Sequence, residues 1–518
     1  MKILLAGPGT GKTTKIKSLI RNEYRDFENI LVLSFTNATV NDLKGSFRDF
    51  ENVEIYTLHS YALKINHLPH LHVLNDRTET QVMERYARIA NIEFNEFCSL
   101  VNCVTFQYMI ENCISFIKAN PAYAIENIGE IDLLIVDEFQ DFNEIERELV
   151  YLLSEYSKET IILGDDDQSI YGFKDADPDG IISLYNNDGN IEKLEHENIC
   201  YRCPDTIVDH CTNLINKNNH RIPKEWKKSN KEGSLYFYQF VTNEDTNQFL
   251  IKEIKQIKSN FKDDSMLILS PVRFYIPGLL NYLDINNIKY LDFWSNDIED
   301  ELRIKIWWLN ALYGKHRILF LLFLTKYYNF TSNRRFLKSI ISLFKENFRE
   351  DTFIDLILSF KIFPDTFSEY IIKPIPIKSF FEKYPDYMIL QDFIDEDDLD
   401  DSLNNLMKNI NPNLLFDKEK VNIMSIHKSK GLQADNVFIL NLNEGIIPNV
   451  ISGTDTIEAQ RRLLYVGMTR AIKNLYLIAT LSWEGRYVHR VDKSQFKYQY
   501  QKKVYFGKTS RFVTEMKK

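Results

Sequence analysis

The residues of this chain best suited to chemistry follow short apolar runs, and the first run leads into a phosphate-binding pattern. Residues 6–14 read AGPGTGKTT and come directly after the run that starts at Lys2. Glycines let backbone N–H groups turn toward a phosphate at a helix N-terminus, where a lysine reaches the β- and γ-phosphates and the next hydroxyl binds Mg²⁺. We therefore expect a nucleotide site with Lys12 on phosphate and Thr13 on Mg²⁺, formed by Gly7, Pro8, Gly9, Thr10, Gly11, Lys12, Thr13 and Thr14.

Acidic residues follow a second apolar run. Residues 131–136 are mostly apolar, and residues 137–141 read DEFQD. A phosphate-hydrolysing site needs one carboxylate for Mg²⁺ and one to activate the attacking water. An acidic helix N-cap would explain one of these carboxylates but hardly three around a glutamine. The pattern predicts that Asp137 binds Mg²⁺ and that Glu138 is the general base.

A third apolar run, at residues 160–163, is followed by GDDDQSIYGF at residues 164–173. Three consecutive aspartates repel one another unless they meet cations or amide donors. The sequence therefore predicts such groups beside Asp165, Asp166 and Asp167.

Parallel strands covered by helices would position these residues. Apolar runs without alternation are typical of strands buried on both faces, and ligands of open α/β sheets sit beyond the carboxyl ends of the strands. We therefore expect an α/β fold. The candidate strands are Lys2–Ala6, Ile30–Ser34, Val53–Thr57, Ile131–Val136, Thr160–Leu163, Met266–Ser270, Val421–Ser425, Val437–Asn441 and Leu475–Ala479.

These runs form two groups, before about Tyr201 and after about Gly233. A largely helical stretch interrupts each group, and the stretch within the first group contains no strand candidate. Two parallel-sheet cores, each with a mainly helical insertion, account for this pattern. The predicted bounds are 1–65 and 128–200 for the first core, 66–127 for its insertion, 201–305 and 417–483 for the second core, 306–416 for its insertion, and 484–518 for a basic tail.

Composition limits the class of protein. The chain has 518 residues, 44% hydrophobic residues and a net charge of -10, which excludes a disordered chain and a histone-like basic binder. The segment from Glu484 to Lys518 holds ten Lys and Arg against three acidic residues, interleaved with Tyr and Phe. It suits phosphate and base contacts, and a solvated terminal extension explains it equally well.

Six cysteines in a chain of this length are too sparse for a disulfide scaffold, so we expect reduced thiols and a cytoplasmic location. The apolar start is too short for a signal sequence, and Ile318–Leu324 is too short to span a bilayer. Cys200, Cys203 and the pair His210-Cys211 have zinc-like spacing, but buried thiols are the better explanation because no second CxxC follows.

The motifs together, and their order, resemble those of superfamily 1A DNA helicases of the UvrD/Rep/PcrA type. Besides the P-loop, the matching segments are LSFTN at 33–37, TLHS at 57–60, DEFQD at 137–141, GDDDQSIYGF at 164–173, YR at 201–202, SIHKSKGLQ at 425–433 and RRLLYVGMTRA at 461–471.

The resemblance implies two RecA-like motor domains that use ATP and Mg²⁺ to move 3′→5′ along single-stranded DNA and unwind duplex. It implies that Tyr201 stacks on adenine, that Gln433 bonds the ribose, and that Gln168, Arg202 and Arg470 sense or stabilise the γ-phosphate. Aromatic rings also suit sequence-tolerant base stacking. The implied DNA contacts are Phe35, Thr36, Asn37, Thr57, His59, Tyr171, Phe173 and His427.

Three positions depart from the family pattern: Phe173 stands for Trp, Gln433 for Glu and Lys174 for Arg. The adenine-reading Gln segment that usually precedes the P-loop has no counterpart before residue 6, which leaves adenine selectivity open. An alternative function is therefore an ATP-switched sensor of DNA ends or single strands that acts through a partner, such as a nuclease in defence or repair. A P-loop ATPase unrelated to nucleic acid would require the DNA-contact motifs to be accidental.

Overall fold

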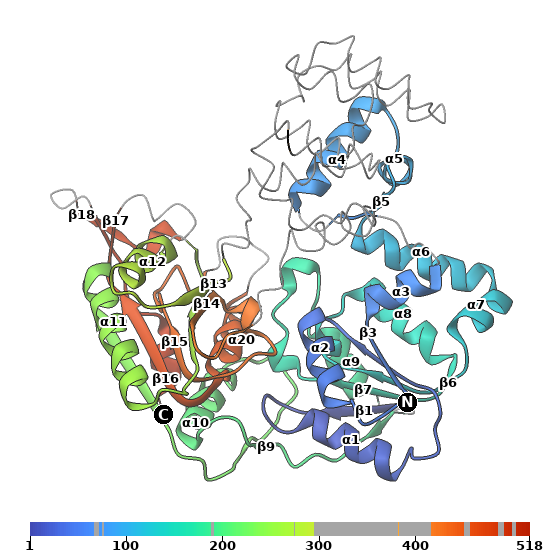
Figure 1. Cartoon of the computed structure of the whole chain (residues 1–518), viewed down its shortest axis with the longest axis horizontal. Coiled ribbons are helices and arrows are strands. Elements are labelled where there is room, and N and C mark those ends of the chain that lie inside the picture. The colour runs from blue at the N-terminus through green and yellow to red at the C-terminus, as the bar shows by residue number, and fades with distance from the viewer. Residues whose placement is uncertain are drawn as a thin grey trace. The chain divides into compact units, whose positions relative to one another are not determined.

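The computed structural model describes residues 1–66, 72–74, 77–187, 191–273, 275–294, 382, 416–449, 456–484, 492–499 and 504–517. The chain divides into two compact units (Figure 1). One unit contains Met1–Tyr61, Ile114–Trp294 and Leu414–Lys518, and the other contains Ala62–Cys113 and Ser295–Asn413. Nearly all of the predicted insertion at 306–416 lies outside the described residues.

The first unit holds two six-stranded parallel sheets, which confirms the predicted α/β class. The first sheet, blue to teal in Figure 1, has the order β3-β2-β6-β7-β1-β8. The apolar residues of its central strands are buried on both faces, as in strands covered by helices. The strands are β1 (Lys2–Leu5), β2 (Ile30–Ser34), β3 (Val53–Thr57), β6 (Ile131–Val136), β7 (Ser157–Gly164) and β8 (Glu192–Lys193).

Helices of the first core cover this sheet through apolar faces with helical spacing. Ile16, Leu19 and Ile20 of α1 and Leu43 of α2 pack in one cluster with the strand residues. The helices are α1 (Lys12–Asn22), α2 (Asn37–Ser46), α3 (Leu58–Asn66), α8 (Glu144–Ser154) and α9 (Asp179–Asn186), and short 3₁₀ turns η1 (Phe139–Asp141), η2 (Asp166–Gln168) and η3 (Gly172–Lys174) follow strand ends.

The second sheet has the order β11-β16-β15-β12-β14-β13, again all parallel. Its strands are β11 (Ser234–Phe240), β12 (Met266–Ser270), β13 (Tyr290–Asp292), β14 (Val421–Ser425), β15 (Ala434–Ile439) and β16 (Ala471–Thr480). Its helices are α10 (Asp205–Ile215), α11 (Asn243–Asn260), α12 (Ile276–Ile285) and α20 (Ile457–Met468), with the turn η6 (His427–Ser429) after β14. A two-residue pair, β9 (Ile199–Cys200) with β10 (Lys227–Lys228), precedes this sheet.

The chain end folds partly onto the second core. Phe512 is buried in its apolar core, and Arg511 and Glu515 pair with Glu444 and Arg461 of that core. The elements here are β17 (Ser482–Glu484), β18 (Lys497–Gln499) and β19 (Val504–Phe506) in one antiparallel sheet, η8 (Lys493–Gln495) and α21 (Arg511–Glu515).

The described residues between 62 and 127 are mainly helical, with one difference from the sequence expectation. Two short strands, β4 (His72–Val73) and β5 (Cys103–Val104), pair in parallel, although no strand was expected there. Two residues are too few to produce a periodic signal. The helices are α4 (Arg77–Ala90), α5 (Phe94–Leu100), α6 (Phe106–Ala119) and α7 (Pro121–Ile128). Among the described residues, no helix is long and apolar enough to cross a bilayer.

Candidate nucleotide and DNA site

The phosphate-binding turn lies between β1 and α1, where the sequence places it. Gly11 precedes the helix at φ 84°, a left-handed conformation that favours glycine, and Lys12, Thr13 and Thr14 form the first helical turn. The Thr10 hydroxyl donates to the carbonyl of Gly7 at 2.9 Å and closes the turn. The N-terminus of α1 therefore faces the loop with free N–H groups, as phosphate binding requires.

Two glycines of this turn permit close approach by residues of the second core. A Cβ on Gly7 would lie 1.4 Å from the ring of Trp226, and a Cβ on Gly9 would lie 2.4 Å from Cβ of Arg202. Tyr201 N–H also donates to the Gly9 carbonyl at 2.9 Å. Pro8 lies between these contacts. Any side chain at either glycine would push the two cores apart at the nucleotide site.

Lys12 and Glu138 meet directly in the site. Lys12 Nζ lies 2.9 Å from Glu138 Oε1, and Glu138 has φ 56°, an unusual value for a residue with a side chain. Burial would raise the pKa of Glu138, but Lys12 and Lys430 outweigh it and hold that pKa well below its usual range. Glu138 is therefore ionised at neutral pH, as a general base must be.

Asp137 supplies the second carboxylate at the end of β6. Burial raises its pKa to about 6, and its Oδ1 accepts the N–H of Glu138 at 2.9 Å. Carboxylate and hydroxyl oxygens are the ligands that Mg²⁺ prefers. Asp137, at the end of β6, offers a carboxylate, and Thr13, at the start of α1, offers a hydroxyl. These ligand types fit a Mg²⁺ ion.

Lys430 is a residue of this site that the sequence did not predict. It follows η6 of the second core, donates to Asp141 Oδ2 and to the Gln168 carbonyl (2.8 Å), and lies 3.5 Å from Glu138 Oε2. Burial raises the pKa of Asp141 to about 7. The lysine stands within the segment SIHKSKGLQ, so its charge was visible in the sequence, but its distant partners, such as Asp141 289 residues away, were not.

Gln168 and Arg470 are brought together from the two cores. Arg470 Nη2 donates to Gln168 Oε1 at 3.3 Å, and Gln168 Nε2 donates to Asp165 Oδ2 at 2.8 Å. Burial and the nearby Arg202 lower the pKa of Arg470 to about 9. A buried guanidinium held by an amide and backbone carbonyls is well placed to meet a phosphate charge.

Arg202 and Gln433, both of the second core, form another contact between a guanidinium and an amide. Arg202 Nε donates to Gln433 Oε1 at 2.9 Å and its Nη1 donates to the Thr469 carbonyl at 3.4 Å. The ring of Tyr201, next to Arg202, is 59% exposed. An exposed ring beside the P-loop is available for stacking on a base.

The predicted DNA-contact aromatics form a continuous row. Ring centroids are 5.0 Å apart between Phe35 and Tyr171, 5.8 Å between Tyr171 and Phe173, and 5.4 Å between Phe173 and His427. Phe173 is 62% exposed, and Lys174 Nζ lies over the rings of Phe35 and Tyr171. A row of rings beside a cation is suited to nucleobases and phosphates.

Comparisons with known proteins agree with this geometry. The UvrD/REP helicase N-terminal domain matches residues 2–85 and 66–188, and the UvrD-like helicase C-terminal domain matches residues 376–482. This chain belongs to the UvrD/Rep/PcrA-like helicases.

Individual relatives cover most of this UvrD-like chain. The ATP-dependent DNA helicase PcrA of Leuconostoc citreum is 22% identical over 93% of the chain and 80% of its own length. The ATP-dependent DNA helicase Rep of Buchnera aphidicola subsp. Acyrthosiphon pisum is 26% identical over 74% of the chain and 68% of its own length. The ATP-dependent DNA helicase srs2 of Schizosaccharomyces pombe is 24% identical, with 93% and 70% covered.

The remaining predicted DNA contacts of this UvrD-like helicase lie at helix starts beyond β2 and β3. Thr36 caps α2 by accepting the Thr39 N–H at 3.1 Å, with Asn37 exposed beside it. Thr57 caps α3 in the same way with Ser60 at 3.1 Å. His59 lies 3.3 Å from Glu146, and burial lowers the pKa of His59 to about 4. His59 is therefore neutral and already partnered within the first core.

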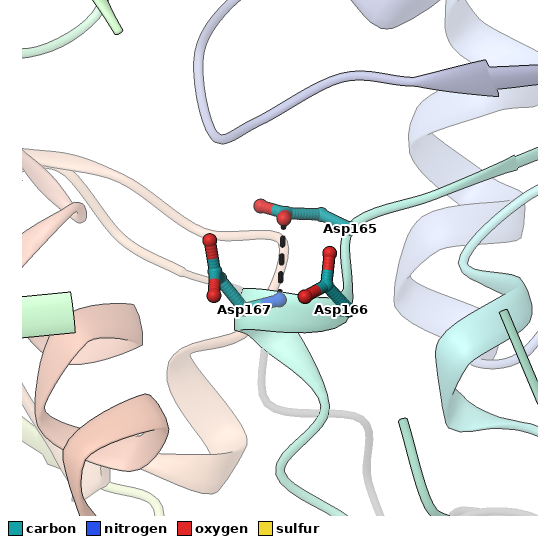
Figure 2. A group of neighbouring side chains, drawn as sticks. All are labelled: Asp165, Asp166 and Asp167. Atoms are coloured by element: carbon teal, nitrogen blue, oxygen red, sulfur yellow. Dashed lines mark hydrogen bonds between the residues drawn. The ribbon is translucent and has the colours of Figure 1, made fainter. Parts of the chain in front are cut away.

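The three aspartates meet cations, as their repulsion requires. Figure 2 shows Asp165, Asp166 and Asp167 gathered at η2, and the Asp167 N–H donates to Asp165 Oδ1 at 3.2 Å. Lys224 and Arg221 of the second core contact these carboxylates. The sequence predicted cations or amide donors beside these aspartates but gave no sign of which residues supply them.

Among the described residues, the cysteines with zinc-like spacing are not gathered with His or other ligands into a cluster of possible metal ligands. All six cysteines are free and buried. His210 is held by the Thr206 carbonyl of its own helix, and the group of Asp165–Asp167 is the one cluster of possible metal ligands found among the described residues. Burial raises the pKa of Cys211. These thiols belong to the apolar core around α10.

Proposed function

We propose that the chain is an ATP-dependent DNA helicase that moves 3′→5′ on single-stranded DNA and unwinds duplex. One observation carries the proposal: Lys430 of the second core contacts the catalytic carboxylates of the first core and lies 5.5 Å from the ring centroid of Tyr171, in the aromatic row. A single side chain thus touches the hydrolytic site and the candidate DNA surface.

The roles of the first-core residues in hydrolysis follow from these contacts. The P-loop N–H groups and Lys12 bind the phosphates, and the phosphates compete with Glu138 for the Lys12 ammonium. Freed from that ion pair, Glu138 accepts a proton from the attacking water. Asp137 and Thr13 would hold Mg²⁺, which supplies positive charge against the phosphate oxygens.

The second core supplies positive charge from the opposite side. Arg470 and Arg202 approach the γ-phosphate. Gln168 senses whether that phosphate is bound and transmits this to the segment that leads into the aromatic row. Tyr201 stacks on the base and Gln433 bonds the ribose. Because the cores share this site, ATP binding and release change their spacing, which is the movement that a translocating motor needs.

The DNA surface proposed here is local. The row of Phe35, Tyr171, Phe173 and His427 accepts any base, because every base has a π-face. The chain carries a net charge of -10, so phosphate contacts fall to individual basic residues such as Lys174, and binding weakens with salt. Six free cysteines support a cytoplasmic location.

Two assays test the proposal. ATP hydrolysis is measured with and without single-stranded DNA, and strand displacement is measured on duplexes with a 3′ or a 5′ tail. We expect DNA-stimulated hydrolysis and displacement of the 3′-tailed duplex. Stimulation without displacement of either duplex would favour the DNA sensor that acts through a partner, and preference for the 5′ tail would contradict the polarity.

A further inference from the structure

Lys224 is a buried lysine that no step of hydrolysis uses. It lies in the segment between α10 and β11, and its side chain is 3% exposed. Its Nζ lies 2.9 Å from Asp165 Oδ1 and 3.1 Å from Asp167 Oδ2, and it donates to Asp166 Oδ1. Burying a long, charged side chain costs both rotamer entropy and desolvation. Holding this lysine in one buried position therefore costs considerable free energy.

Other groups of the same segment complete the neutralisation. Arg221 donates twice to Asp167, at 2.9 and 2.7 Å, and the Ile222 N–H donates to Asp166 Oδ2 at 2.9 Å. Burial would lower the pKa of Lys224, but the three carboxylates raise it above its ordinary value. Lys224 is therefore an ammonium ion at neutral pH. It stands where a metal ion would stand, since the three carboxylate oxygens lie within 4.8 Å of one another.

The cluster is connected to the hydrolytic site through Asp165. Oδ1 of this residue faces Lys224, while Oδ2 accepts the Gln168 amide N–H at 2.8 Å. The other end of that amide accepts from Arg470 at 3.3 Å. A continuous chain of polar contacts therefore runs from Lys224 through Asp165 and Gln168 to Arg470. A shift of the Asp165 carboxylate would therefore rotate the Gln168 amide and change the hydrogen-bond partner of Arg470.

We propose that Lys224 is a positioning residue for ATP hydrolysis, which holds Asp165 so that Gln168 and Arg470 stay aligned; this rests on the proposed function. The ammonium acts as a built-in cation. A metal ion would neutralise the three aspartates equally well, but it would not tie residues 221–228 of the second core to the first core. Lys224 both neutralises the aspartates and ties the two cores together. Gln168 and Arg470 are therefore aligned only when residues 221–228 join the two cores.

The test removes the ammonium and then returns it. In Lys224→Ala, we expect DNA-stimulated kcat to fall about tenfold or more while KM for ATP changes less than about threefold, because misplaced catalytic groups cost rate rather than binding. The missing atoms are those of n-propylammonium, which should restore part of kcat; n-propanol should not. Lys228→Ala is the matched control, since Lys228 pairs with Asp209 on the surface of the same segment.

A double-mutant cycle with Gln168→Ala separates positioning from general support of the fold. If Lys224 acts through Gln168, Lys224→Ala lowers kcat much less in the Gln168→Ala background than in the wild type. Full additivity, or an unchanged kcat in Lys224→Ala, would overturn the proposal. If Lys224→Ala does not fold, Asp166→Asn replaces it, because that variant changes the charge of the cluster and keeps its shape.

The two proposals fail separately. Wild-type protein without DNA-stimulated hydrolysis would contradict the helicase function. In that case, the thermal stability of Lys224→Ala with n-propylammonium still reports on the pocket: stabilisation relative to n-propanol supports the built-in cation, and no difference contradicts it.

Discussion

Two acidic clusters lie side by side at strand ends of the first core, and they differ in how completely they are paired. Asp137, Glu138 and Asp141 follow β6, and Asp165–Asp167 follow the neighbouring strand β7. Each receives a buried lysine from the second core, Lys430 in one and Lys224 in the other. Within the described part of the chain, Asp141 Oδ1 has no hydrogen-bond partner, whereas the carboxylates after β7 all face cations or N–H groups.

The difference separates chemistry from positioning. In the cluster after β6, Lys12 pairs with Glu138, and in the proposed mechanism this ion pair is exchanged when phosphate binds to Lys12. In the cluster after β7, Lys224 and Arg221 belong to no phosphate-binding element. We propose that the cluster whose cation can be exchanged takes part in ATP hydrolysis, and that the cluster with permanent cations holds Gln168 and Arg470 in place.

The largest expected effect comes from the base. In Glu138→Gln, DNA-stimulated kcat should fall by about 10²–10⁴-fold, because the amide cannot accept the proton of water. Steady-state phosphate release measures it. Glu148→Gln, on the surface and paired with Lys118, is the matched control and should turn over normally. Normal turnover in Glu138→Gln would show that the general base does not lie in the cluster after β6.

The next effect comes from Lys430. Lys430→Met leaves the carboxylates after β6 without their second-core cation, so DNA stimulation of hydrolysis should fall about tenfold or more, as for loss of a charged group at a reacting centre. The ratio of rates with and without single-stranded DNA measures it. Lys473→Met, which removes a lysine paired with Asp264 elsewhere in the second core, should keep the ratio. An unchanged ratio in Lys430→Met would break the proposed link between DNA and base.

Stability provides a direct comparison of the two clusters. At pH 6, Asp141 is mostly protonated, since burial raises its pKa to about 7, and Asp141→Asn should change the unfolding free energy little. Although burial opposes it, Lys224 and Arg221 lower the pKa of Asp167. Its ionised form is therefore favoured in the folded state, and Asp167→Asn should cost about 3 kcal/mol, because the buried Arg221 loses its carboxylate partner and Lys224 loses one of three.

Denaturant unfolding of both variants at pH 6 and pH 8 measures this contrast. The wild type loses stability as pH rises through the raised pKa of Asp141, so Asp141→Asn should gain on the wild type between these pH values. The Asp167 contribution is present above its unfolded pKa and is lost only as pH falls toward its lowered folded pKa. Equal losses in the two variants at pH 6 would show that the clusters do not differ in this way.

The smallest effect concerns DNA. Phe173→Ala should weaken single-stranded DNA binding by about 1–3 kcal/mol, the range for loss of one stacked base. Fluorescence anisotropy of a labelled oligonucleotide measures it. Phe261→Ala, which removes an equally exposed ring elsewhere, is the control. Unchanged DNA affinity in Phe173→Ala would show that the aromatic row does not contribute to DNA binding.

The sequence predicted strands well where burial is complete on both faces. Ile30–Ser34 and Met266–Ser270 match β2 and β12 residue for residue. It missed β11: Ser234–Phe240 is an edge strand rich in Tyr and Phe, and none of its residues is fully buried. The run Val437–Asn441 was predicted to start three residues after the start of β15 and to end two residues after its end, because the polar residues Asp435 and Asn436 interrupt the apolar pattern.

Local motifs indicated the first-core half of the site, and long-range pairing supplied the rest. The P-loop and DEFQD could be assigned because each follows its own strand. Lys430 and Lys224 could not, because their partners are set by how the two sheets pack, and nothing in the neighbouring residues records that. The three aspartates look as catalytic as DEFQD in the sequence, and only the cations around them distinguish the two groups.

The most direct measurement of the central claim is ATP hydrolysis by wild type and Glu138→Gln, each with and without single-stranded DNA. We predict strong DNA stimulation in the wild type and none in the variant, with the variant still folded and still binding DNA. Hydrolysis that ignores DNA in the wild type, or that survives in Glu138→Gln, would contradict a DNA motor driven from the cluster after β6.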